Sequence, residues 1–512
     1  MTGWSEGYVA DIGYTYGYYT ELNPLRTRLA MLNAGVAVPE IKTACELGFG
    51  QGVSVNVHAA ASATTWAATD FNPSQANFAQ ELARASGSDV LLADQAFAEF
   101  CARDDLPNFD YIGLHGIWSW ISDANRKVIA DFVARKLNVG GILYISYNTL
   151  PGWSNFAPMR HLMVQHEQRM SASGSGIVSR IEGAIGFADK LLETNPGYLK
   201  ANPAAKPRFE PLKTQNRHYL AHEYFNQDWH PMYFADMAKW LADAKMTFAC
   251  SANYLDHINP INFTPEQAQL LADIPDRMLV ETTRDFLVNQ QFRKDYWVKG
   301  PITLPRMEQL AQIRAERVVL VNPRADVSMK ANGPLGEVTM RDDVYGPVLD
   351  VLADHQVRTI GEIEAAVEPK GINLAQIIEV MLVMGSQGQI TSAQSKEAAK
   401  ACRKRAHDLN KTLIKRAYTS GDVAALASPV TGGGIALPRF AQLFVEAVEQ
   451  GKKTAADLAQ HVWTILAAQG QAIVKEGKAL EGEAANVAEL QGQADTFLKK
   501  QLPILKALEM VG

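Results

Sequence analysis

A glycine-rich turn between a short apolar strand and a helix constrains the fold of this chain more than any other feature. Residues 41–47 (IKTACEL) are typical of a buried strand, and residues 53–61 of a helix. Between them Gly48, Gly50 and Gly52 follow a G-x-G-x-G spacing. An open α/β sheet binds ligands beside such turns, where glycine lets the backbone approach closely. The turn therefore predicts an α/β sheet with a ligand site.

Strands and helices then alternate along the next hundred residues. Strands are expected over 65–70, 90–93, 109–115 and 141–147, with helices over 74–86, capped by Asn72 or Ser74, and 124–137. Residues 151–217 interrupt this alternation with a long helix near 177–193. It resumes with a helix over 232–244, a strand over 246–254 and a seventh strand over 295–299. We expect a doubly wound, parallel, Rossmann-like core of seven strands with a helical insertion.

The length of 512 residues predicts several domains, because single domains average roughly 100–200 residues. Residues 1–40 would form an N-terminal lid segment whose helix over 25–34 stops at Gly35. Residues 41–300 would form the core, with the insertion at 151–217 and a further region at 218–300. Residues 301–395 resemble a winged-helix-like domain, in which strands 317–321 and 336–340 could pair beside helices over 344–355, 360–367 and 374–384. Residues 396–512 should form an α-helical C-terminal domain, broken at 432–434.

The chemistry of the turn favours a nucleoside ligand without a pyrophosphate. Val53 stands where the dinucleotide-binding fingerprint needs its third glycine, and Glu46 precedes the first glycine by two. A carboxylate there suits the ammonium of S-adenosylmethionine. The predicted cofactor contacts in this turn are Glu46, Gly48, Phe49, Gly50, Gln51 and Gly52. The alternative is a tight turn that binds nothing.

Acidic residues also end the next two strands. Asp70 could accept both ribose hydroxyls, and Asp94, with the neighbouring amide of Gln95, could accept from the adenine amino group. Phe71 could stack on the adenine or belong to the core. Both acids could instead cap helices. Together the strand ends predict S-adenosylmethionine as cofactor and S-adenosylhomocysteine as product.

Aromatic and imidazole side chains follow the fourth and fifth strands, where a methyl acceptor would lie. The candidates on this side are His115, Trp118, Tyr147, Asn148, Trp153, His222 and Glu223, with His115 also beside the cofactor. Tyr14, Tyr16, Tyr18 and Tyr19 precede the sheet and could fold over the cofactor as a lid, with Tyr16 on the substrate side and Tyr19 beside the cofactor.

Each of these candidates has a structural alternative. Tyr16 and Tyr19 could share a helical face packed on the core, and His115 could be a hydrogen-bonded structural histidine. One of Trp118 and Trp120 should be core, because they alternate. Glu223 could sit at a helix start.

Five segments together resemble a known family. They are TYGYYTELNP (15–24), HGIWSWI (115–121), SYNTLPGW (146–153), LAHEYFNQDWHPMYF (220–234) and RDFLVNQQFRKDYWVKG (284–300). They are similar to bacterial class I methyltransferases that carry a methyltransferase regulatory domain, among them outer-membrane-protein lysine methyltransferases. The resemblance is close over 8–300 and looser beyond. It implies a Rossmann-like core, an insertion (151–217) able to mediate a homodimer, and later domains that shape the substrate surface.

The expected activity is therefore protein lysine N-methylation. A lysine amine has a pKa of about 10.4, and burial beside aromatic rings would lower it. The two extra domains favour a macromolecular acceptor over a small one. The alternatives are a small-molecule or peptide O- or N-methyltransferase of a biosynthetic pathway, and a regulator that binds S-adenosylmethionine and, through 301–395, DNA. Helix 374–384 carries no Lys or Arg, which disfavours the regulator.

Composition limits the kinds of binding partner and the cell compartment that we expect. A net charge of −6 disfavours nucleic acid. The four cysteines are scattered, and His222 and His230 lack helical i, i+4 spacing, so no metal site or disulfide framework is predicted. The first 20 residues lack a secretory signal pattern, and no apolar run is long enough to cross a membrane. We expect a cytoplasmic protein.

Overall fold

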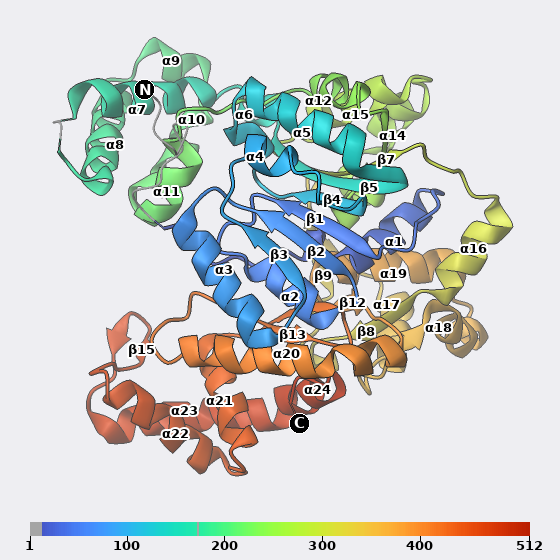
Figure 1. Ribbon diagram of the computed structural model, residues 1–512, viewed down its shortest axis with the longest axis vertical. Coiled ribbons are helices and arrows are strands. Elements are labelled where there is room, and N and C mark those ends of the chain that lie inside the picture. Colours follow the sequence, from blue (N-terminus) through green and yellow to red (C-terminus); the bar gives the residue numbers. More distant parts are fainter. Residues whose placement is uncertain (1–12, 172–173, 512) are drawn as a thin grey trace.

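The computed structural model describes residues 13–171 and 174–511 (Figure 1). Residues 1–12 lie outside this part, so the predicted lid segment is described only from residue 13. Residues 172–173 and 512 lie outside it as well.

A seven-stranded sheet forms the centre of the molecule, as the sequence predicted. Its strands are β1 (Thr43–Leu47), β2 (Thr65–Thr69), β3 (Val90–Ala93), β4 (Phe109–Leu114), β5 (Leu137–Asn148), β6 (Met246–Ser251) and β7 (Phe292–Lys299). They lie in the order β3-β2-β1-β4-β5-β7-β6. The pairs from β3 to β5 are parallel. The expectation of a wholly parallel sheet was wrong, because β7 enters between β5 and β6 and runs antiparallel to both.

Helices cover both faces of the sheet. On one side lie α1 (Pro24–Asn33), α2 (Val53–Ala61) and α3 (Pro73–Ser86), and on the other α4 (Phe97–Cys101), α5 (Asp123–Lys136) and α12 (Phe234–Ala242) (Figure 1). Successive strand residues point to opposite faces, so Tyr111 and Tyr144 join one core cluster while Ile112 and Leu143 join the other. Asn72 caps α3 by accepting the Ser74 N–H, as predicted.

The interruption of the sheet is helical, with an apolar core of its own. It contains α6 (Leu150–Trp153), α7 (Ala157–Met170), α8 (Ile177–Glu193), α9 (Gly197–Ala201), α10 (Ala205–Phe209) and α11 (Arg217–Tyr224). Phe156, Met163, Ile181 and Leu220 are among the buried residues of its core cluster. In Figure 1 these helices project beside the sheet. Before β7 come α13 (Asn259–Asn262), α14 (Pro265–Ala272) and α15 (Arg277–Leu287).

Region 301–395 mixes short strands with helices, as expected, but its predicted pairing was wrong. It comprises α16 (Arg306–Ala315), β8 (Arg317–Leu320), β9 (Lys330–Gly333), β10 (Gly336–Thr339), α17 (Asp342–Val351), β11 (Arg358–Thr359), α18 (Ile360–Val367), α19 (Leu374–Ser386) and β12 (Ile390–Ser392). β8 pairs with β11 and β12, whereas β10 pairs with β9 across a two-residue turn. Tight local closure of this hairpin removes β10 from β8.

The C-terminal region is mainly helical, but it contains two short hairpins that the sequence did not predict. Its elements are α20 (Lys396–Arg416), β13 (Ala425–Ser428), β14 (Gly433–Ala436), α21 (Arg439–Glu449), α22 (Ala455–Ala467), β15 (Val474–Lys475), β16 (Lys478–Ala479), α23 (Gly482–Thr496), a π-helical turn (Phe497–Gln501) and α24 (Leu502–Ala507). Figure 1 shows α20 crossing beneath α2 and α3. Val57 of α2 and Leu409 of α20 belong to one buried cluster, so this region packs directly on the sheet domain.

The described residues contain neither a membrane-spanning helix nor a cluster of metal ligands. None of the helices within 13–171 and 174–511 is long and apolar enough to cross a membrane. In the same part of the chain, no group of three or more His, Cys, Asp or Glu side chains could hold a metal ion.

Candidate active site

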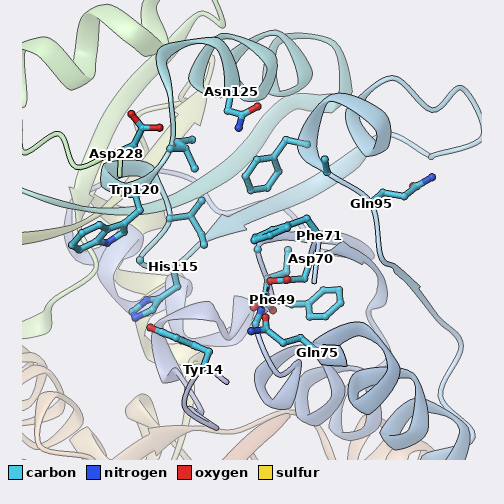
Figure 2. A pocket seen from close by; sticks show the side chains of 18 of the residues that line it. Tyr14, Phe49, Asp70, Phe71, Gln75, Gln95, His115, Trp120, Asn125 and Asp228 are labelled. Carbon is cyan, nitrogen blue, oxygen red and sulfur yellow. Dashed lines mark hydrogen bonds between the residues drawn. The ribbon is translucent and has the colours of Figure 1, made fainter. Parts of the chain in front are cut away.

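A deep pocket opens at the carboxyl ends of β1, β2 and β4. The empty space in the pocket and at its mouth, including open solvent, is about 1110 Å³. Nine of the predicted site residues line it, namely Tyr19, Glu46, Gly48, Phe49, Gly50, Asp70, Phe71, Gln95 and His115. Figure 2 shows Asp70 and Phe71 near its centre. The sheet thus brings strand ends that are distant in sequence into one cavity.

The glycine turn forms the floor of the pocket, and glycine is required there for space as well as for conformation. Gly48 has a φ of +78°, and a Cβ on it would lie 2.5 Å from Cδ1 of Ile117. Gly52 has a φ of +70° at the N-cap of α2, where a Cβ would lie 2.4 Å from the Cβ of Ala79. Any side chain would push the turn away from the pocket or α3 away from α2.

Two carboxyl groups are buried beside this turn. Glu46 is only 3% exposed, and its Oε2 has no hydrogen-bond partner among the described residues. Burial, with the nearby Asp70 carboxylate, raises the pKa of Glu46 to about 8. Asp70 accepts the N–H groups of Gly50 at 2.9 Å and Asn72 at 3.0 Å, and burial still raises its pKa to about 7. A buried acceptor without a partner is costly, so this corner is suited to a cationic ligand group.

The opposite part of the pocket is apolar. Phe71, Ala96 and Phe97 line it. Both oxygens of Gln95 already accept hydrogen bonds from the protein. Its backbone carbonyl accepts from the Thr69 hydroxyl at 2.5 Å, and its side-chain Oε1 accepts from Arg103 at 3.2 Å. Figure 2 shows the Gln95 amide pointing away from the cavity. This part of the pocket therefore offers flat apolar surface to a planar ring.

Stacked aromatic rings form the remaining wall. The imidazole of His115 stacks on Tyr19, with ring centroids 3.9 Å apart, and its Nδ1 lies 2.7 Å from the hydroxyl of Tyr144. Burial lowers the pKa of His115 to about 4, so the ring is neutral near pH 7. Tyr14 also lines the pocket, and its ring meets His222 edge-on at 5.0 Å.

A further carboxylate lies close to this wall. Glu223 follows His222 on α11 and is partly buried. Burial raises the pKa of Glu223 to about 7, although the positive charge of Arg160 opposes the shift. Burial raises the pKa of Tyr19, and the Glu223 charge adds to that shift. Glu223 is not among the residues that line the cavity.

Sequence comparison identifies relatives over the whole chain. An uncharacterized protein from Synechocystis sp., sll1526, is 39% identical over 510 residues, which is 99% of each chain. Residues 216–299 match the family model described as a predicted methyltransferase regulatory domain. The chain belongs to the family of class I methyltransferases with a regulatory domain.

More distant likenesses agree with this family. The uncharacterized protein RP789 of Rickettsia prowazekii is 27% identical over 297 residues, covering 55% of this chain and 51% of that protein. The solved structure of PKMT2 from Rickettsia typhi in complex with AdoHcy superposes with a TM-score of 0.70 at 16% identity, covering 97% of this chain and 99% of that one. The shared fold therefore extends beyond the sheet to the added regions.

The pocket of this methyltransferase fits S-adenosylmethionine. The Oε2 of Glu46, which has no hydrogen-bond partner among the described residues, is an acceptor for the ammonium of the cofactor. The glycine turn leaves room for the amino acid end of the cofactor. Phe71 and Phe97 provide apolar surface for the adenine ring. Two turn residues predicted as contacts do not line the cavity. The Gln51 amide donates to the Tyr14 carbonyl at 3.2 Å, and Gly52 serves the packing of α2 on α3.

The prediction that Asp94, at the end of the third strand, contacts the cofactor is also corrected. Asp94 is exposed and does not line the cavity. β3 ends at Ala93, and the chain presents Ala96 and Phe97 to the cavity instead. The polar adenine contact expected of Asp94 is thus replaced by apolar surface.

Several predicted acceptor-side residues lie in the methyltransferase core instead of the pocket. Trp118 is fully buried against Trp240, whereas Trp120 lines the cavity. The Tyr147 hydroxyl donates to Asp295 at 2.8 Å, inside the core. The Asn148 N–H donates to the Ser119 hydroxyl at 2.8 Å. Side chains on β5 point away from the cavity at 147, because the strand alternation that aims Tyr144 at His115 sends Tyr147 to the other face.

Two further candidates belong to other clusters. The indole of Trp153 donates to the Gln291 carbonyl at 3.0 Å and packs in the core of the insertion. Tyr16 lies outside the cavity, against Phe78 at 5.2 Å and beneath the guanidinium of Arg416 at 4.0 Å. Both roles proposed from the sequence are therefore corrected to packing roles. His222 does not line the cavity, but its ring contacts that of Tyr14, which does.

Sequence reasoning also missed residues that line the cavity. Ile117, Asn125 and Asp228 are among them. Ile117 follows the fourth strand directly and could have been considered with His115. Asn125 and Asp228 come from a helix start and a loop, and no local pattern marks them.

Proposed function

We propose that the protein is an S-adenosylmethionine-dependent protein lysine N-methyltransferase. The observation that carries the proposal is the whole-chain likeness to PKMT2, a protein lysine methyltransferase bound to AdoHcy, which covers 97% of this chain. The likeness includes regions 301–395 and 396–511, which lie outside the cofactor core and would shape the surface met by a large substrate.

The cofactor would be held by groups of β1 and β2. Glu46 would accept from the ammonium of the amino acid end, and the Asp70 oxygens, which already accept from Gly50 and Asn72, have remaining lone pairs for the ribose hydroxyls. When bound, S-adenosylmethionine supplies an electrophilic methyl group on a positively charged sulfur. Holding both reactants in line is the main contribution of the protein, worth roughly 7–11 kcal/mol in well-aligned reactions.

The aromatic wall is suited to a lysine side chain. Tyr14, Tyr19 and His115 would enclose the aliphatic stem and exclude water. Low polarity disfavours the ammonium form, so the amine would lose its proton more readily. Neutral His115 and the Glu223 carboxylate, whose pKa is about 7, are the groups placed to influence that proton.

The insertion would support a homodimer, and the cell compartment would be the cytoplasm. Met170, Val178 and Phe187 of α7 and α8 are exposed at 73%, 37% and 42%, which is unusual for large apolar side chains. All four cysteines are free and buried, as a reducing compartment permits. Sedimentation of the wild type and Phe187→Asp tests the dimer, because a monomeric wild type would refute it.

Labelled S-adenosylmethionine, incubated with the enzyme and lysate, tests the activity. We expect label in protein, released as methyl-lysine on acid hydrolysis, and Glu46→Gln should reduce it at limiting S-adenosylmethionine. The exposed Asp94→Asn variant is the matched carboxylate control and should retain it. Label confined to low-mass species would overturn the lysine acceptor while sparing methyl transfer. Affinity for S-adenosylhomocysteine without any transfer, together with salt-dependent DNA binding, would favour a regulator.

A further inference from the structure

A glycine hairpin of the C-terminal region closes on the tyrosine segment at 13–19. The backbone N–H of Gly434 donates to the Tyr18 hydroxyl at 2.7 Å. A Cβ on Gly434 would lie 2.8 Å from Cζ of Tyr18, and one on Gly433 would lie 2.7 Å from the Tyr18 hydroxyl. The Tyr18 ring therefore rests directly on bare backbone, where even a methyl group would displace it. The glycine run at 432–434, which the sequence marked only as a helix break, forms this seat.

The same segment is fixed along α2 from its other side. The Tyr18 hydroxyl lies 3.2 Å from Nε2 of His58, and the Tyr19 N–H donates to the Ser54 hydroxyl at 2.9 Å. Residues 54 and 58 are one helical turn apart and share a face of α2. Burial lowers the pKa of His58 to about 3, so it faces Tyr18 as a neutral ring. Tyr18 is thus held between the helix that follows the glycine turn and the C-terminal hairpin.

Other residues of the tyrosine segment contact either the pocket or the C-terminal region. Tyr14 and Tyr19 line the pocket, whereas Tyr16 packs beneath Arg416 of α20. Asn23 adds a long contact by donating to the Thr431 carbonyl at 3.5 Å. The described part of 396–511 contributes no residue to the pocket lining. Besides the packing of α20 on α2 and α3, the tyrosine segment gives this region a direct connection to residues of the pocket wall.

We propose that the Gly433–Gly434 hairpin is a positioning element for cofactor binding. It holds Tyr18, and through the short intervening chain it keeps Tyr14 and Tyr19 against the pocket. The proposal rests on the proposed function, because it takes S-adenosylmethionine as the ligand. In this role the C-terminal region supports cofactor binding, although Gly434 and Tyr18 are 416 residues apart in the sequence.

Three single variants of the full chain test this role. Gly434→Ala adds a methyl group where the Tyr18 ring lies, and Tyr18→Phe keeps the ring but removes the hydroxyl. Gly492→Ala is the matched control, because a Cβ there meets nothing within 4 Å. The measurements are the Kd of S-adenosylhomocysteine by calorimetry, the KM and kcat for S-adenosylmethionine, and hydrogen exchange of residues 13–22.

We expect Gly434→Ala to raise Kd and KM about tenfold and to leave kcat at saturation close to the wild-type value. Tyr18→Phe should raise Kd about twofold to tenfold, the range expected for lost hydrogen bonds. Both should exchange faster at 13–22, and Gly492→Ala should match the wild type. If Gly434→Ala does not fold, Tyr18→Phe carries the test.

The alternative outcomes separate this proposal from the proposed function. A fall in kcat with unchanged KM would mean a general loss of folded enzyme, and faster exchange with unchanged Kd would mean a contact without effect on the pocket. Either result overturns the positioning role while wild-type binding of S-adenosylhomocysteine keeps the methyltransferase assignment. A wild type that fails to bind S-adenosylhomocysteine would overturn both.

Discussion

Replacing Glu46 by glutamine should weaken cofactor binding and increase the stability of the ligand-free protein at high pH. The Glu46 carboxyl is 3% exposed, and burial raises its pKa from 4.5 to about 8. In the free protein at pH 7 only about one tenth of the molecules carry the charged form, and at pH 6 about one hundredth. An ammonium ligand binds the charged form, so wild-type affinity for S-adenosylhomocysteine should rise about tenfold from pH 7 to 8 and then level off, with a steeper rise below pH 7, where Asp70 also titrates.

The glutamine variant should lose this dependence. Hydrogen bonds to charged groups contribute roughly 1.5–3 kcal/mol, so we expect its Kd at pH 8 to be about 10 to 150 times that of the wild type. A weaker slope below about pH 7 should remain, because Asp70 titrates there. Calorimetry at pH 6, 7, 8 and 8.5 measures both profiles. A flat wild-type profile, or equal slopes in both proteins between pH 7 and 8, would refute the role of Glu46.

The ligand-free stabilities should differ in the opposite direction. The folded-state pKa of Glu46 lies above its unfolded value, so the folded protein binds the proton more tightly. Its contribution to stability is complete below about pH 4.5 and is lost as pH rises through 8. Glutamine avoids burying that charge, so the variant should be a few kcal/mol more stable at pH 9 and similar at pH 5. A lower Tm of the variant at pH 9 would contradict this.

Other substitutions test the remaining assignments. Gly50 has a φ of +57°, so Gly50→Val should abolish S-adenosylhomocysteine binding while circular dichroism stays native; undiminished binding would reject the turn as the cofactor site. Arg293→Ala leaves three buried carboxylates without their cation and should cost about 3–5 kcal/mol in urea unfolding, whereas an unchanged midpoint would show that they pair elsewhere. The three are Glu281, Asp285 and Asp295. Tyr147→Phe removes a hydroxyl from buried Asp295 and should cost about 1–3 kcal/mol with KM unchanged; a changed KM would place Tyr147 in the site after all.

Local signals in the sequence were sufficient for the strands of the central sheet and for several helices. The helices over 53–61, 177–193 and 360–367 and the strand over 90–93 begin and end as predicted. Caps and periodic apolar residues mark such ends within a few positions along the chain. The glycine turn and the acids at its two sides were likewise visible, because strand ends in a parallel sheet meet at one edge.

Pairing and distant contacts were not visible. The sequence pattern offered 336–340 as the partner of 317–321 and did not mark β12 as a strand, whereas in the structure β10 pairs with β9 and β12 pairs with β8. Trp118 and Trp120 differ in environment because a 3-10 turn, not a strand, carries them. The place of Tyr16 depends on Arg416, 400 positions away, which no local pattern reports.

The order of the strands has a consequence for synthesis of the chain. β5 pairs residue by residue with β7, from Ile142 opposite Val298 to Asn148 opposite Phe292. Until the ribosome has released residue 299, β5 is therefore an open edge with buried-type side chains, and the nascent sheet is prone to pair with other chains. A truncation that ends within the insertion should consequently aggregate instead of forming a smaller working enzyme.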